Sequence, residues 1–501
     1  RWYPGSGIYR NVWLVKTEKV HVGQWGPQIS VNVLPSGDGR VVVKIPIENH
    51  TRLPVKFQTT TEFFELDSTG KKGAKVQIPF LGLLDGTIHL EKDFSWTDNG
   101  YTIPKPKLWS INSPNLYLAV TMLMLPGGKV VDIVETPYGI RSFKFTKDNG
   151  FLLNGERVPL KGVCNHHDRG ALGAAFNVRA AERQLEILKG MGVNAIRTSH
   201  NPPAPELLDL CDRMGFVVMD EAFDMWAAKK KRNDYHLLFA DWHEADVRAF
   251  VRRDRNHPSI VFWSIGNEVP EQANPNQFHV ARELAAIVRE EDPTRPVTAG
   301  CNHVTAGYNG FQNIVDVFGF NYKPDQYPKF RQMNPDIPLY SSESSSCVSS
   351  RGEYFFPVSN DKAQGRADFQ VSSYDLYAPS WAMPPDTEFK GQDANPFVGG
   401  EFVWTGFDYL GEPTPFNADL SNLQNYSDPA EKARAEKELR EIGKIRTPSR
   451  SSYFGIVDLA GFPKDRYYLY QARWRPDFPM AHILPHWNWP ERVEQVTPEI
   501  G

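Results

Sequence analysis

The chain lacks the features that mark several whole classes of protein. Its 501 residues include only four cysteines, which are widely spaced and form no CxxC pair: Cys164, Cys211, Cys301 and Cys347. This pattern favours buried thiols over a zinc site or a dense disulfide framework. No apolar run reaches the roughly 18 residues that a membrane-spanning helix needs, so we expect no membrane span.

Neither sign of charge is in large excess. The 56 basic and 60 acidic residues are interspersed and leave a net charge of −4, whereas a nucleic-acid-binding surface would need a basic stripe. We therefore expect no nucleic-acid partner. Aromatic residues are plentiful at 12%, including 13 tryptophans. Most should lie in the core, and exposed rings could stack on sugars.

Both ends of the chain are abrupt. It opens on Arg1-Trp2-Tyr3-Pro4-Gly5 and closes on residues 497–501, as a fragment of a longer protein would, and it begins without the charged-then-apolar pattern of a secretion signal. If the N-terminus is truncated, a periplasmic or extracellular location is favoured over the cytoplasm. The oligomeric state, including a homo-oligomer, stays open.

Residues 18–141 have the pattern of an all-β domain. Alternating runs such as 29–33 and 41–45 are separated by the turn at 35–39, and further runs follow around 55–66 and 116–125. This spacing predicts a β-sandwich. Because the region carries no cluster of acids and histidines, we expect it to brace the domain that follows.

Residues 142–485 alternate short apolar strands with helical runs. The eight candidate strands are Val158–Val163, Asn194–Thr198, Phe216–Asp220, Ile260–Ile265, Pro296–Ala299, Val315–Phe320, Ile337–Ser341 and Phe397–Trp404. The clearest helices, with apolar residues at i, i+3, i+4 spacing, are Ala180–Met191, Pro205–Met214, Trp242–Arg253 and Phe278–Glu290. This order predicts a (β/α)8 barrel. The alternative, an open doubly wound sheet, lacks its glycine-rich phosphate turn.

Three segments fall outside a minimal barrel. Asp428–Lys444 is a charged helix in a loop of the catalytic face, and we expect it to be solvated. Phe355–Pro357 and Tyr377–Trp381 lie in the preceding long loops, where exposed aromatic rings could build sugar subsites.

Two apolar runs of strand length each end in a glutamate. Trp263-Ser264-Ile265-Gly266-Asn267 leads to Glu268, and Ser341-Ser342 leads to Glu343. An acid at the carboxyl end of a barrel strand lies where barrel enzymes keep their chemistry. A retaining glycosidase needs two carboxyl groups about 5 Å apart, one as acid/base and one as nucleophile. We therefore predict a glycosidase with Glu268 as acid/base and Glu343 as nucleophile.

Other polar residues end the same strands, at Asn165–Arg169, Arg197–Pro202, Asp220–Asp224, Asn321–Tyr322 and Trp404. Such a rim suits a polyhydroxylated ligand, so we expect a carbohydrate substrate as the partner. Histidines in this rim also invite a metal, but they lack the i, i+4 spacing of a helical zinc site. We expect no metal and no cofactor.

The neighbours of the two glutamates have predicted roles. Asn267 could orient a ring hydroxyl beside the attacked carbon, and Arg197 would hold Glu343 ionised or form a structural ion pair inside the barrel. A third acid, Glu401, competes for the nucleophile role, but it lies three residues before Trp404 and therefore deeper along its strand. We rank it below Glu343.

These stretches resemble glycoside hydrolase family 2, and in particular its β-galactosidase branch. The resemblance extends over essentially the whole chain and is carried by residues 162–168, 194–202, 220–224, 263–268 and 402–404. It implies that Glu268 is the acid/base and Glu343 the nucleophile. It further implies contacts to substrate or nucleophile from seven residues: His166, Asp168, Arg197, His200, Asn267, Tyr322 and Trp404.

The resemblance also implies a domain order. Residues 1–17 would be the remnant of a jelly-roll sugar-binding domain, 18–141 an immunoglobulin-like sandwich, 142–485 the catalytic barrel and 486–501 a linker into a further domain. The implied fold class is therefore β plus α/β: an immunoglobulin-like β-sandwich followed by a (β/α)8 TIM barrel.

The chain departs from the best-known β-galactosidases at two places. After the third strand it offers Asp224 but no histidine for magnesium, so a magnesium requirement does not carry over, and Ser344-Ser345-Ser346 follows the nucleophile. The Asn-x-Lys motif of the family's glucuronidases has no convincing counterpart, although Arg351 could bind a carboxylate. The predicted function is a retaining exo-β-galactosidase. The alternatives are a β-glucuronidase or β-mannosidase of the same family and a catalytically inactive carbohydrate-binding protein.

Overall fold

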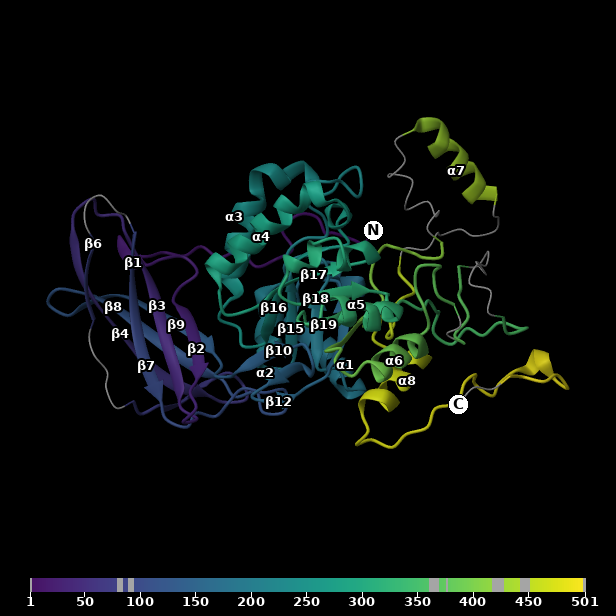
Figure 1. The fold of residues 1–501 in the computed structure, drawn as a ribbon, viewed down its shortest axis with the longest axis horizontal. Helices are drawn as coiled ribbons and strands as arrows, with labels where there is room; N and C mark the ends of the chain where they lie inside the picture. The colour runs from purple at the N-terminus through teal and green to yellow at the C-terminus, as the bar shows by residue number, and fades with distance from the viewer. Residues whose placement is uncertain are drawn as a thin grey trace.

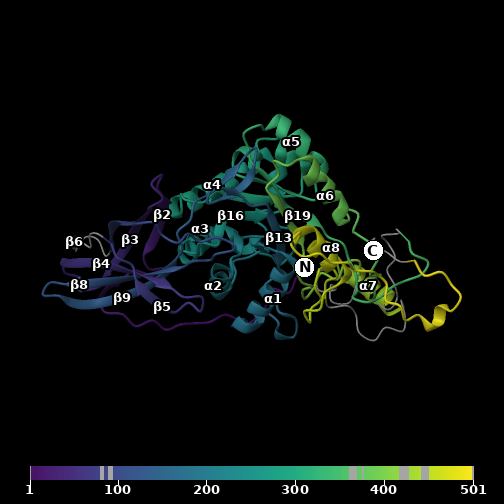
Figure 2. The ribbon, with the colours of Figure 1, turned by 90° about the horizontal axis from the view of Figure 1, so that it is seen from below.

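The computed structural model describes residues 2–78, 84–88, 94–359, 369–374, 377–416, 428–441 and 451–498. Figures 1 and 2 show a sandwich of β-sheets at one end of the long axis and a barrel in the middle. The helix of residues 429–441 and the C-terminal segment lie at the other end. No helix in these described ranges is long and apolar enough to cross a membrane.

Two antiparallel sheets form the N-terminal sandwich. One contains β1 (Val20–Val22), β2 (Gln28–Val33), β3 (Gly39–Asn49) and β7 (Phe94–Ile103). The other contains β4 (Val55–Leu66), β5 (Lys72–Lys75), β6 (Leu84–Ile88), β8 (Tyr117–Leu125) and β9 (Lys129–Tyr138). Alternate residues of β3, from Val41 to Ile47, are buried against Phe63 and Leu123 of the facing sheet. The predicted β-sandwich is therefore confirmed.

The sandwich packs against the segment that enters the fourth barrel strand. Asn256 joins the two units, because its Oδ1 accepts from Ile29 N at 2.9 Å and its Nδ2 donates to Pro27 O at 2.8 Å. Arg141 donates to Ile260 O at 2.6 Å, at the amino end of that strand. These contacts brace the end of the barrel opposite the carboxyl ends of the strands.

Eight parallel strands close into a barrel, as predicted. In order around the barrel they are β13 (Leu160–Asn165), β14 (Ala195–Thr198), β15 (Val217–Glu221), β16 (Ile260–Asn267), β17 (Val297–Cys301), β18 (Phe318–Asn321), β19 (Leu339–Ser345) and β20 (Gly400–Trp404). A small antiparallel sheet of β10 (Phe143–Thr146), β11 (Gly150–Leu153) and β12 (Glu156–Arg157) precedes them. Every residue of β16 is buried, as in a strand covered on both faces.

Helices cover the outside of the barrel. They are α1 (Val178–Met191), α2 (Pro205–Met214), α3 (His236–Asp254), α4 (Phe278–Glu291), α5 (Tyr327–Met333), α6 (Pro385–Ala394) and α8 (Asp465–Trp474). A further helix, α7 (Pro429–Glu441), stands apart from the barrel (Figure 1). Short 3₁₀ turns are η1 (Gly170–Leu172), η2 (Pro270–Ala273), η3 (Pro275–Gln277), η4 (Val304–Gly307), η5 (Phe311–Asn313), η6 (Pro324–Gln326) and η8 (Pro490–Arg492). Between β17 and β18, whose connection is fully described, η4 and η5 replace the α-helix of a regular barrel unit.

Local sequence signals set the helix ends. The Asn177 side chain accepts from Ala180 N at 2.9 Å and caps the start of α1. Pro205 begins α2, and Gly215 ends it with a φ of 72°, where a Cβ would lie 2.1 Å from Ile111 O. The predicted helix Asp428–Lys444 corresponds to α7, and residues 442–444 lie outside the described residues.

Candidate active site

A cavity of about 840 Å³ opens at the carboxyl ends of the barrel strands. Its walls come from the loops after β14 to β20 and from the N-terminal segment. They consist of Trp2, His200, Asp224, Lys230, Lys231, Asn267, Glu268, Asn302, Tyr322, Lys323, Glu343, Trp381, Trp404, Glu412, Pro413 and Thr414. Both predicted catalytic glutamates therefore lie in one cavity.

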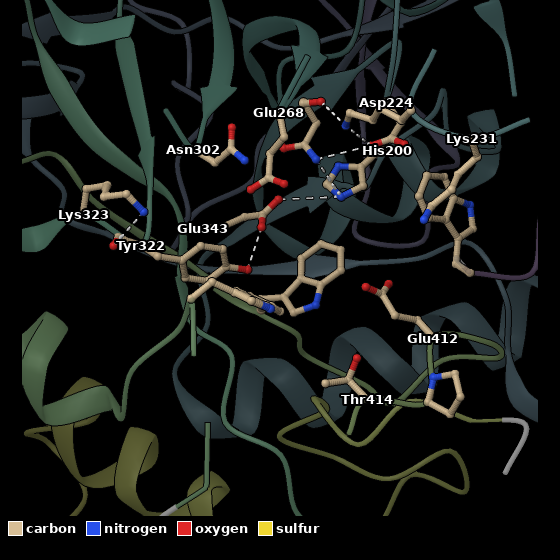
Figure 3. A pocket seen from close by; sticks show the side chains of 16 residues that line it. His200, Asp224, Lys231, Glu268, Asn302, Tyr322, Lys323, Glu343, Glu412 and Thr414 are labelled. Atoms are coloured by element: carbon tan, nitrogen blue, oxygen red, sulfur yellow. Dashed lines mark hydrogen bonds and ion pairs between the residues drawn. The ribbon is translucent and has the colours of Figure 1, made fainter. Parts of the chain in front are cut away.

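Glu268 and Glu343 approach each other from the fourth and seventh strands of the barrel, β16 and β19. Figure 3 shows their carboxyl groups pointing toward one another. Asn321 connects the two, because it pairs with Glu343 in the β18–β19 register and its Nδ2 donates to Glu268 Oε1 at 2.9 Å. The facing pair is the arrangement that a double displacement requires.

The backbone at the strand ends aims these side chains. Glu268 follows β16 directly and has a φ of 47°, and Tyr322 follows β18 with a φ of 59°. The strand register shifts between Ser264 and Asn267 and again between Phe320 and Asn321. Irregularities of this kind turn a side chain away from the regular alternation of a strand.

Glu343 is held by two donors. Arg197 Nη1 donates to Oε1 at 2.9 Å, and Tyr322 OH donates to Oε2 at 2.6 Å. Burial raises the pKa of Glu343 to about 8, Arg197 and Tyr322 oppose that rise, and the charge of Glu268 adds to it. Arg197 and Tyr322 therefore favour the ionised form of the nucleophile against the effect of burial.

Arg197 and Glu221 lie directly beneath the cavity. Arg197 is fully buried, and its Nη2 donates to Glu221 Oε2 at 2.8 Å and to Asn267 Oδ1 at 2.9 Å. Glu221 Oε1 also accepts from His200 Nδ1 at 2.6 Å. One guanidinium therefore fixes the nucleophile and the residue before the acid/base, as a buried bidentate cation can.

Of the seven predicted contact residues, four line the cavity: His200, Asn267, Tyr322 and Trp404. The other three lie one layer behind its wall. Trp2 stacks on His166 with ring centroids 4.8 Å apart, and Asp168 Oδ2 accepts from Leu410 N at 3.2 Å. Burial raises the pKa of Asp168 to about 6. Arg197 reaches Glu343 but not the cavity surface.

Sequence reasoning overlooked several residues of this site. Glu221 and Asn321 belonged to the predicted rim but received no role, although each ends a strand beside an assigned residue. Trp2 carried no signal, because only the fold brings the N-terminal segment to the cavity. Its contact is an isolated bridge to Gly411, with Tyr3 N donating to Leu410 O at 2.9 Å.

Asp224, the acid after the third strand, forms an ion pair with a lysine. Lys230 Nζ donates to Asp224 Oδ1 at 2.9 Å and to Asn267 O at 2.5 Å. Because an ammonium group already pairs with the one carboxylate offered, the residues here do not fit a magnesium ion.

The competing acid Glu401 lies away from the cavity. Its Oε2 accepts from Ser344 Oγ at 2.5 Å, and the side chain is 2% exposed in β20. Burial and the neighbouring Glu388 raise its pKa to about 8. This position gives Glu401 no access to a substrate in the cavity.

Comparison with known proteins places the chain in a family. Residues 145–353 match the model of the glycosyl hydrolases family 2 TIM barrel domain, and residues 20–141 match that of glycosyl hydrolases family 2. The chain belongs to glycosyl hydrolase family 2. The predicted family and fold class are confirmed.

Relatives of this family 2 chain have more than one named activity. It is 40% identical over 531 residues to a β-galactosidase of Bacteroides ovatus, covering 98% of this chain and 58% of that protein. It is 31% identical over 523 residues to a putative β-glucuronidase of Formosa agariphila, covering 98% and 44%. A solved β-glycosidase from Bacteroides vulgatus has a TM-score of 0.78 at 31% identity, covering 99% and 60%. The chain thus spans about half the length of the curated relatives it matches.

Proposed function

We propose that this family 2 chain is the catalytic part of a retaining exo-β-glycosidase that hydrolyses terminal non-reducing β-galactosides. The observation that carries the proposal is the pair Glu268 and Glu343 facing each other across one cavity (Figure 3). An inactive carbohydrate-binding protein would not need both carboxyl groups in this arrangement.

The two glutamates divide the reaction. Glu343, oriented by Arg197 and Tyr322, attacks the anomeric carbon and forms a glycosyl-enzyme ester, while Glu268 donates its proton to the departing oxygen. In the second step water attacks the ester while Glu268 removes a proton from that water, and Glu343 is released as a carboxylate. Glu268 loses its proton in the first step and regains one from water in the second, so the pair carries one proton again at the end of the cycle.

Galactose is supported by the relative with the higher identity, 40% against 31%. Arg351, which could have bound a sugar carboxylate, pairs with Asp458 at 2.7 Å and does not line the cavity. One observation favours β-glucuronidase as the second candidate: Lys231 and Lys323 both line the cavity and could hold a carboxylate.

A trapping experiment tests the mechanism. A 2-deoxy-2-fluoro-β-galactosyl fluoride should label Glu343, as found by peptide mass spectrometry, and should not label the Glu343→Gln variant. Glu401→Gln is the matched control, because it removes a buried glutamate outside the cavity, and it should be labelled like the parent. Labelling of another residue would refute Glu343 as the nucleophile, and no labelling with any fluorosugar would refute the double displacement.

A panel of nitrophenyl β-glycosides tests the sugar. We expect the highest kcat/KM for the β-galactoside. If the β-glucuronide or β-mannoside is cleaved faster while Glu343 is still labelled by the matching fluorosugar, the mechanism stands and the galactose assignment is wrong.

A further inference from the structure

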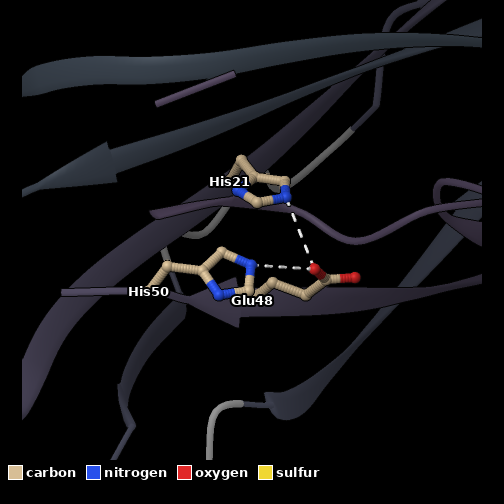
Figure 4. Close-up of side chains that lie close together, drawn as sticks. All are labelled: His21, Glu48 and His50. Atoms are coloured by element: carbon tan, nitrogen blue, oxygen red, sulfur yellow. Dashed lines mark hydrogen bonds and ion pairs between the residues drawn. The ribbon is translucent and has the colours of Figure 1, made fainter. Parts of the chain in front are cut away.

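Two histidines and a glutamate meet on the sandwich, where β1 pairs with β3 (Figure 4). His21 and Glu48 are direct partners in the antiparallel register. His50 follows Glu48 by two positions and so faces the same side, and its backbone N donates to Lys19 O at 2.8 Å. Backbone hydrogen bonds therefore hold all three residues in place.

The ligand atoms converge on one point. Glu48 Oε2 lies 3.5 Å from His21 Nε2 and 3.3 Å from His50 Nε2, and one ligand atom from each of the three lies within 4.8 Å of the others. In a tetrahedral site with Zn–N and Zn–O bonds near 2.05 Å, neighbouring ligand atoms are about 3.3 Å apart. The two contacts to Glu48 match that spacing.

Second contacts orient two of the side chains. His21 Nδ1 donates to Glu18 O at 2.9 Å, so a neutral His21 directs the lone pair of Nε2 at the Glu48 carboxylate. Gln24 N donates to the other carboxylate oxygen, Oε1, at 3.3 Å, which leaves Oε2 facing the histidines. A cation between these lone pairs removes their repulsion, and a backbone carbonyl behind a metal-binding histidine is the usual arrangement.

We propose that His21, Glu48 and His50 bind one Zn²⁺ ion. Two imidazoles and one carboxylate suit zinc rather than calcium or magnesium, which prefer oxygen ligands. Water would complete the tetrahedron. The ion would fasten the three-residue strand β1 to β3. Strand β1 directly follows residues 2–19, the segment that leads from Trp2 at the catalytic cavity to the sandwich. The expectation that residues 18–141 carry no cluster of acids and histidines is therefore wrong, because strand pairing brings His21 to the other two.

Zinc titration of the full chain, freed of metal by a chelator, tests the site. Isothermal titration calorimetry with ZnCl₂ near neutral pH should show one equivalent bound per chain, and His21→Ala, His50→Ala or Glu48→Gln should each weaken binding about tenfold or more. His243→Ala is the matched control. His243 Nε2 lies 3.3 Å from Glu283, but in the described part of the chain this pair belongs to no cluster of three metal-binding side chains. That variant should bind zinc like the parent.

Thermal unfolding gives an independent readout. Zinc should raise the unfolding midpoint of the parent and of His243→Ala, but not of His50→Ala, because only binding to the folded sandwich is stabilising. No zinc binding by the parent would mean that the contacts are imidazolium–carboxylate pairs only and would overturn the proposal. Equal binding by all three sandwich variants would overturn it as well, because the zinc would then lie elsewhere.

Discussion

At the scale of single residues, the proposed chemistry depends on the ionisation of Glu343. Arg197 beneath the cavity balances two carboxylates at once, those of Glu221 and Glu343. The guanidinium therefore cannot also neutralise Glu268. Burial and the charge of Glu268 raise the pKa of Glu343 to about 8, and Arg197 and Tyr322 limit that rise.

Glu268→Gln should change the pH profile in a defined way. In the parent, kcat/KM should rise as the pH approaches about 8, because Glu343 must be ionised to attack. In the variant this rise should move to lower pH for a dinitrophenyl β-galactoside, because the charge of Glu268 no longer raises the pKa of Glu343 and this leaving group needs no proton. Steady-state rates across pH measure the shift. A variant with an unchanged profile would show that another group is responsible for the rise.

At the scale of elements, the ends of the barrel strands carry the site and the loops after them hold it in place. The loop after β15 (Val217–Glu221) returns through Lys230 to the backbone of Asn267, the last residue of β16. Since Glu268 comes next with a positive φ, this contact steadies the acid/base.

Lys230→Ala should lower kcat for nitrophenyl β-galactoside about tenfold, equivalent to about 1.4 kcal/mol of transition-state stabilisation, because the end of β16 loses its anchor. Lys229→Ala is the control, since that lysine is exposed and does not line the cavity. An unchanged kcat in Lys230→Ala would show that the strand end is held without the ammonium group.

Glu401 in strand β20 (Gly400–Trp404) should make the free energy of unfolding depend on pH. The folded chain keeps the proton of Glu401 up to about pH 8, whereas an unfolded glutamate releases it near 4.5. The free energy of unfolding should therefore fall as pH rises between these values and stay lower above pH 8. Glu401→Gln removes this ionisation, so its urea midpoint should change less than the parent's between about pH 5 and pH 9. The exposed Glu431→Gln should follow the parent. An equal pH response in Glu401→Gln would place the proton elsewhere.

The barrel strands show how far secondary structure could be predicted from the sequence. All eight barrel strands were found, because continuous apolar runs such as Ile260–Ile265 indicate burial on both faces. The predicted end of the seventh at Ser341 was too early, since β19 continues to Ser345. Polar serines gave no strand signal there. They stay buried because Ser342 donates to Asn321 and Ser344 to Glu401.

At the scale of the whole molecule, the N-terminal segment connects the catalytic cavity of the barrel with the sandwich. It precedes β1 of the sandwich, yet Trp2 lines the catalytic cavity and covers His166. The sandwich itself braces the opposite end of the barrel through Asn256 and Arg141.

Trp2→Ala should raise KM for a β-galactoside about tenfold and change kcat less, because an indole in the cavity wall can stack on a sugar without touching the reacting atoms. Trp13→Ala is the matched control on the same segment, since Trp13 is 78% exposed and does not line the cavity. Steady-state kinetics of both variants provide the measurement. An unaltered KM in Trp2→Ala would show that the segment plays no part in binding.

The sequence by itself determined the two-part architecture, the barrel and the position of two glutamates at strand ends, because these depend on local periodicity and on acids that end apolar runs. Only the tertiary structure decided which polar residues meet. It placed Trp2 against His166, paired Glu221 with Arg197 and brought His21 to Glu48. Such contacts join residues far apart in the chain, and their distances follow from strand pairing and barrel closure, which no local pattern encodes.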